Sequence, residues 1–133
     1  MTGDAHSRHF LLATLLTALL ATGCGGTTLP QTNLHHARHL SENVRIGDRE
    51  ALAVWIYAEA PDFRLVAAAG EGFTCVDDVA RLAVVMLLHA KRTGSAESRD
   101  SAMGMLEFVL ALQAEDGQFY NFLNEDRTIN RDG

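Results

Sequence analysis

Two adjacent aspartates, Asp77 and Asp78, are the residues whose types and spacing best suit chemistry. They open an otherwise apolar segment that continues to His89, and Arg81 follows within one helical turn. Burying such charges without partners is costly, so the carboxylates either face a cleft or pair with Arg81. As ionised acceptors they could hold a polar ligand or act as a general base. The alternative is a local ion pair at a helix start with no chemical role.

A helix is expected to position these side chains. Thr74 and Asp77 have the spacing of a capping box, which places the start of the helix near Cys75. The partial positive charge of a helix start favours ionised carboxylates there. Apolar residues occur on every side of the segment up to Lys91, which is typical of a central, buried helix. Gly94 is expected to end it in a left-handed conformation.

Two further helices are expected, one over residues 48–60 and one from Ser95 or Ser98 to Gln113. The connections after the central helix are short enough for antiparallel neighbours. Trp55, in the first of these helices, could stack on a sugar ring or serve as an ordinary core aromatic. The sequence therefore predicts an all-α fold of antiparallel helical hairpins.

The segment after the third helix contains a turn signal, Asp116-Gly117, followed by an aromatic run. We expect this run to be extended. Phe119 and Phe122 would then pack under the helices, while Tyr120 and Asn121 would point outward.

Two motifs resemble a known family. They are Asp77-Asp78-Val79-Ala80-Arg81 and, about 40 residues later, Gln113-x-x-Asp116-Gly117-x-Phe119-x-Asn121-Phe122. Together they resemble the start of the six-hairpin glycosidase-like toroids, and more narrowly the helical domain of bacterial proteins often labelled glycosyltransferase or glycosidase. The resemblance covers roughly residues 49–130. It implies a partial (α/α)6 toroid. Six hairpins need upwards of about 200 residues, so the chain is expected to be the N-terminal part of a longer enzyme.

The resemblance also implies a carbohydrate ligand and a set of site residues. Asp77 and Asp78 would be catalytic. The residues expected to contact the substrate are Arg81, Trp55, Tyr120 and Asn121. No cofactor or metal is expected.

Two functions follow as hypotheses. The first is glycoside hydrolysis or glycosyl transfer on a poly- or oligosaccharide. Such chemistry uses two carboxyl groups on opposite sides of a glycosidic bond, whereas neighbouring Asp77 and Asp78 point about 100° apart on one helix. At most one of them is therefore catalytic. The alternative is a non-catalytic, lipid-anchored helical module that binds a sugar or another protein.

The N-terminal segment resembles a bacterial lipoprotein signal. An apolar run over residues 10–21 has signal-peptide length and is followed closely by Cys24. The resemblance implies cleavage before Cys24 and a lipid on its thiol, which would hold the protein at the bacterial cell envelope, outside the cytoplasm. A plain signal peptide or an uncleaved anchor is the alternative. The expected organisation is a signal peptide (1–23), a flexible tether (24–47) and a helical domain (48–133).

Charge and cysteine content restrict the partners. The chain has 11 Lys and Arg against 17 Asp and Glu, a net charge of -6, and no basic cluster, which argues against nucleic acid. If Cys24 carries lipid, Cys75 is the only remaining thiol and no intrachain disulfide can form. His35 and His39 have metal-chelating spacing if helical, but no third ligand is near, and solvated tether histidines are expected instead. The oligomeric state is not predicted.

Overall fold

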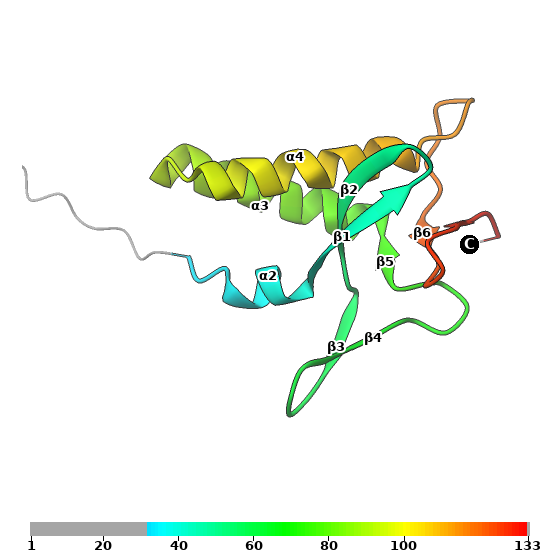
Figure 1. Ribbon diagram of the computed structural model, residues 1–133, viewed down its shortest axis with the longest axis horizontal. Helices are drawn as coiled ribbons and strands as arrows, with labels where there is room; N and C mark the ends of the chain where they lie inside the picture. Colours follow the sequence, from blue (N-terminus) through cyan, green and yellow to red (C-terminus); the bar gives the residue numbers. More distant parts are fainter. Residues whose placement is uncertain (1–31, 133) are drawn as a thin grey trace, which may run out of the picture. The chain divides into compact units, whose positions relative to one another are not determined.

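Three helices and seven strands make up residues 32–132, the part of the chain that the computed structural model describes (Figure 1). The strands form three small antiparallel sheets. The expected all-α fold is therefore wrong. The partial (α/α) toroid is wrong as well, because a toroid is built from inner and outer helices and these residues instead combine one helical hairpin with sheets.

The elements follow one another along the chain as follows. The helices are α2 (His35–Leu40), α3 (Val76–Thr93) and α4 (Ala96–Ala111). The strands are β1 (Ser41–Ile46), β2 (Arg49–Val54), β3 (Tyr57–Glu59), β4 (Arg64–Val66), β5 (Thr74–Cys75), β6 (Phe122–Leu123) and β7 (Ile129–Asn130). The sheets are β1-β2, β3-β4 and β5-β6-β7.

The β1-β2 hairpin replaces the helix expected over residues 48–60. Gly47 has a positive φ of 61° at the first position of the two-residue turn, which suits a tight hairpin of type II′. Val44 and Ile46 alternate with exposed residues along β1, so the strand buries one face. Alanine, leucine and glutamate are good helix formers, but the preference is worth less than about 1 kcal/mol per residue, and pairing with β1 outweighs it.

The same hairpin corrects the expected tether over residues 24–47. From His35 onward the chain forms α2 and then β1, and the side chains of Val44 and Ile46 belong to the hydrophobic core. This part is therefore folded. The expected signal peptide and Cys24 lie outside the described residues, so lipidation stays a prediction. Within residues 32–132, no helix has the length and apolar character needed to cross a membrane.

The helical hairpin of α3 and α4 was predicted correctly. Gly94 ends α3 with a φ of 75°, as expected. The hydroxyl of Ser95 caps α4 by accepting a hydrogen bond from the amide of Ser98. The two helices pack against each other, and α4 packs on β2 (Figure 1). Gly104 allows this approach, because a Cβ there would lie 3.0 Å from the Cβ of Leu52.

The core lies between the helical hairpin and the strands. Its fully buried side chains come from β2, the segment before β5, both long helices and β6. The largest are Phe73, Phe108, Met86, Met105, Leu112, Leu123 and Val79. Leu123 shows that the segment after the helices completes the core. Phe119, which we expected to be packed under the helices, is 47% exposed.

The small sheet β5-β6-β7 joins the two residues before α3 to the segment that follows α4. Cys75 pairs with Phe122, and Thr74 pairs with Leu123. Gly72 lies against this sheet, where a Cβ would meet the carbonyl oxygen of Leu123 at 2.2 Å. Only glycine fits at that position, and its lack of a side chain lets the loop before β5 lie against β6.

Candidate functional site

The candidate site lies at the junction of β5 and α3. Thr74 does not form the expected capping box, because it belongs to β5 and its hydroxyl accepts a hydrogen bond from the amide of Val54. Cys75 occupies the N-cap position without a side-chain cap. The amide of Val76 donates instead to the carbonyl oxygen of Asn121, at 2.9 Å. The helix start is thus anchored by strand pairing and by a residue far along the chain.

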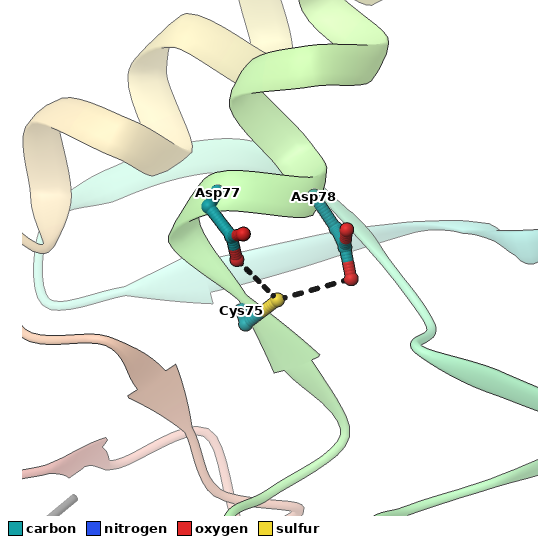
Figure 2. Close-up of side chains that lie close together, drawn as sticks. All are labelled: Cys75, Asp77 and Asp78. Carbon is teal, nitrogen blue, oxygen red and sulfur yellow. Dashed lines mark hydrogen bonds between the residues drawn. The ribbon is translucent and has the colours of Figure 1, made fainter.

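The two aspartates meet at the thiol of Cys75. Figure 2 shows both carboxylates, on the first turn of α3, pointing toward the sulfur. The Sγ atom lies 3.0 Å from Oδ1 of Asp77 and 3.1 Å from Oδ2 of Asp78. A thiol has one proton to donate, so the two carboxylates share it. Cys75 is buried, while the side chains of Asp77 and Asp78 are 51% and 41% exposed.

Arg81 completes the cluster. Its guanidinium lies 2.7 Å from Oδ2 of Asp77 and 3.0 Å from Oδ1 of Asp78. This confirms the ion pairs expected from the spacing of three and four residues on a helix. Each aspartate therefore has one oxygen facing the thiol and the other facing the arginine. Arg81 itself is 71% exposed on its side chain, so it could also donate to a ligand.

Burial and hydrogen bonding set the protonation states of this cluster. Burial, followed by the hydrogen bond to Asp77, raises the pKa of the Cys75 thiol to about 12. The hydrogen bond from Cys75, supported by the charge of Arg81, holds the pKa of Asp77 below its ordinary value. At neutral pH Cys75 is a thiol and Asp77 a carboxylate. Cys75 is therefore a hydrogen-bond donor rather than a nucleophile, since a nucleophilic cysteine must be a thiolate.

The same three residues could be considered as metal ligands. Their ligand-type atoms lie within 4.8 Å of one another, and this is the one such group of three or more found among residues 32–132. However, a cysteine binds a metal as thiolate, and the raised pKa of Cys75 opposes the loss of its proton. The protonated thiol instead donates between the two carboxylates and keeps them together.

The histidines suspected of metal spacing are in α2. The segment is helical, but the Nε2 atom of His39 donates to the carbonyl oxygen of Phe63, at 2.8 Å. His36 packs against the rings of His39 and Phe63. One nitrogen of His39 is therefore occupied by the β3-β4 loop.

Trp55 directly follows β2. Its indole packs on Phe73 with ring centroids 4.7 Å apart, and its Nε1 donates to Glu42 at 2.7 Å. The ring is only half-buried, but one face and the polar edge are already occupied. These contacts favour Trp55 as an ordinary core aromatic over Trp55 as a free surface for stacking on a sugar ring. Its predicted role in substrate binding is not tested by these contacts.

Tyr120 and Asn121 lie where the chain returns to the helix start. Asn121 is exposed and its main chain contacts Val76, so it borders the first turn of α3. Tyr120 is half-buried, with the guanidinium of Arg131 4.7 Å from its ring centroid and also bonded to its hydroxyl. The structure thus brings the main chain of Asn121 to Val76, the residue that precedes the two aspartates. The hydroxyl of Tyr120, by contrast, is engaged by Arg131.

Sequence reasoning missed three residues that hold this region together. Cys75 was visible two residues before Asp77, and a thiol beside two carboxylates was a usable signal. Glu42, in β1, and Arg127, between β6 and β7, form an ion pair, and the guanidinium of Arg127 also lies 4.2 Å from the ring centroid of Phe73. No local pattern could pair residues so far apart.

Comparison with known proteins adds no assignment: no family model matches this chain, and no curated protein resembles it significantly. The functional argument therefore rests on the geometry of the site.

Proposed function

We propose that this protein binds a carbohydrate at the first turn of α3, through the carboxylates of Asp77 and Asp78. The observation that carries the proposal is that both carboxylates are half-exposed while their positions are fixed from behind by Cys75 and beside them by Arg81. An ionised carboxylate has about four acceptor sites, so each has capacity left for ligand hydroxyls. Neighbouring hydroxyls of a sugar ring suit such a paired acceptor.

The surroundings supply the complementary donors. Arg81 exposes much of its guanidinium group beside both aspartates. Asn121 is exposed and its main chain borders the helix start, and its side chain carries both an amide donor and a carbonyl acceptor. Sugar hydroxyls both donate and accept, so a mixed set of carboxylate, guanidinium and amide groups fits them better than it fits an apolar ligand.

Binding is favoured over hydrolysis because the two carboxylates lie on one helix turn. Both of them accept from the same thiol, that of Cys75. Hydrolysis places one carboxyl group on each side of the glycosidic bond, at separations of about 5 Å or more. Asp77 and Asp78 approach a ligand from the same side. A hydrolytic or transfer step would therefore need a further carboxyl group from another part of the protein, with Asp77 or Asp78 as its counterpart.

The experiment is a glycan-array measurement with the full chain, followed by affinity titrations of each glycan that binds. Asp77→Asn and Asp78→Asn are expected to weaken binding about tenfold or more, because hydrogen bonds to charged groups contribute about 1.5–3 kcal/mol. The matched control is Asp100→Asn, which removes the same charge on α4. Asp100 is close to the α3-α4 connection and so at the opposite end of the hairpin from the aspartates.

Three results would decide the matter. Loss of binding in the two site variants, with Asp100→Asn unchanged, supports the proposal. Absence of any bound glycan, or equal binding by all variants, refutes it. If the wild-type chain releases free sugar and one site variant does not, the function is catalysis and not binding alone.

A further inference from the structure

An exposed apolar surface runs along the helical hairpin, outside the candidate site. On α3 four aliphatic side chains are between 39% and 62% exposed, and on α4 three more are between 38% and 52% exposed. These residues are Val84, Val85, Leu87 and Leu88 on α3, and Met103, Leu106 and Leu110 on α4. Clustered exposure of this kind marks interaction sites more often than scattered apolar residues do.

The exposed side of α3 has a regular order. Asp77, Arg81, Val84, Leu88 and Arg92 follow one another at spacings of four, three, four and four residues, and all are exposed. Residues at such spacings share one face of a helix. That face runs the length of α3, opposite the face on which Val79, Ala83 and Met86 are buried.

Charge changes sign from one end of this face to the other. The first turn carries Asp77 and Asp78, and the last turn carries Lys91 and Arg92. Arg92 donates to the hydroxyl of Thr32 at 2.8 Å and makes no ion pair within residues 32–132. Its charge is therefore available to a partner.

This order makes the face complementary to itself when two copies run antiparallel. Val84 and Val85 are the two central residues of the stretch from Asp77 to Arg92, seven residues from either end. A twofold axis there would place Asp77 of one copy opposite Arg92 of the other, twice. It would also place Arg81 opposite Leu88, which the aliphatic part of an arginine side chain can cover.

We propose that α3 pairs antiparallel with α3 of a second copy of this chain, with Val84 and Val85 at the twofold axis. The apolar centre excludes water, and the two Asp77 to Arg92 contacts fix the direction of pairing. This inference does not rest on carbohydrate binding, although Asp77 and Arg81 belong to both surfaces. Arg92 and Val84 lie outside the candidate site and give a separate readout.

The first test is a charge swap in the full chain, measured by analytical ultracentrifugation. Asp77→Arg alone places two arginines opposite each other at both ends of the pair, and Arg92→Asp alone places two aspartates there. Each variant is expected to raise the dimer dissociation constant at least about tenfold, since like charges facing each other are strongly unfavourable. The equimolar mixture of the two variants restores both attractive contacts. It is expected to form mixed dimers with an affinity close to that of the wild type.

Asp77→Arg also disturbs the candidate site, so circular dichroism must show that this variant folds. If Asp77→Arg does not fold, the dimer dissociation constant of Arg92→Asp alone still tests the proposal. A wild-type chain that stays monomeric at high micromolar concentration overturns the proposal. So do single variants that dimerise like the wild type, or a mixture no better than either variant alone. In the last two cases association has another origin, such as the apolar run over residues 10–21, which is the same in every variant.

The second test fixes the direction of pairing by disulfide formation in a Cys24→Ser background, which leaves buried Cys75 as the only native thiol. Val84→Cys, close to the axis, is expected to give a covalent dimer under mild oxidation. Lys91→Cys is the matched control, because in the antiparallel pair its two copies are about 20 Å apart along the helices and cannot be bridged. Equal cross-linking at both positions, or none at Val84→Cys, would overturn the arrangement.

Discussion

The thiol of Cys75 and the carboxylate of Asp77 are 3.0 Å apart, and the proton between them lets two aspartates share one helix turn. If the thiol ionised, three negative groups would lie within 4.8 Å of one another. The cluster therefore depends on a cysteine that stays protonated, and this has measurable consequences.

Stability is expected to fall at alkaline pH because of Cys75. Its pKa is raised from 9.0 to about 12 in the folded chain, so above pH 9 the unfolded chain loses a proton that the native chain keeps. The free energy of unfolding contributed by this group is fully present below pH 9 and falls as the pH rises toward 12, by up to about 1.4 kcal/mol per pH unit. Denaturant unfolding at a series of pH values measures it. The difference from Cys75→Ser, which does not titrate there, isolates the effect, and identical pH profiles for the two proteins would contradict it.

The reactivity of Cys75 toward alkylating reagents should be low in the native chain. A pKa near 12 instead of 9.0 lowers the thiolate fraction at neutral pH on the order of a thousandfold. Asp77→Asn replaces a charged acceptor, which favours the protonated thiol, with a neutral amide, so this variant should react faster than the wild type. Peptide mapping by mass spectrometry follows modification at Cys75 itself. Rapid labelling of the native wild type at neutral pH would be incompatible with the geometry.

Gly72→Ala is expected to destabilise the chain by at least about 3 kcal/mol, or to prevent folding. Its φ is 132°, and a Cβ would overlap the carbonyl oxygen of Leu123 at 2.2 Å. Gly70→Ala is the matched control, since Gly70 also has a positive φ, 79°, but no atom within 4 Å of the added carbon. It should cost about 1–2 kcal/mol, the strain of a left-handed alanine. Thermal unfolding of both variants compares the two costs, and equal losses would show that the contact with Leu123 is not the cause.

Glu42→Ala should cost about 1–3 kcal/mol, because two donors lose their acceptor. The Glu42 carboxylate accepts from Nε1 of Trp55 and pairs with Arg127. Trp55 is the sole tryptophan, so its emission spectrum reports the loss directly. Glu50→Ala provides the comparison, since its ion pair with Arg45 is highly exposed and should contribute about 0–1 kcal/mol. If the two variants were equally stable and the emission spectrum did not change, the half-buried network would carry no stability.

Elements governed by contacts close in sequence were predictable. The boundaries of α3 and α4, the left-handed Gly94 and the pairing of Arg81 with two aspartates all follow from signals within one or two turns. Each of these features is decided by neighbours along the chain, so the local pattern contains the information.

The segment over residues 48–60 was predicted wrongly because its conformation is decided elsewhere. Its composition favours a helix, but Gly47 turns the chain so that Val44 pairs with Ala51. The strand then packs under α4, where Gly104 leaves room for Leu52. A single sequence shows the weak local preference but not the partner that overrides it. This misplaced helix also made a toroid of helical hairpins look plausible.

The sequence by itself determined the chemical groups of the site, namely two carboxylates and an arginine on one helix turn, because that arrangement depends only on helical periodicity. Tertiary structure decided what surrounds them. It brought the carbonyl oxygen of Asn121 to the amide of Val76, engaged Trp55 with Glu42 and Phe73, and buried the thiol of Cys75 against both aspartates. Those contacts join residues far apart in the chain or depend on burial, and neither can be read from the order of the residues alone.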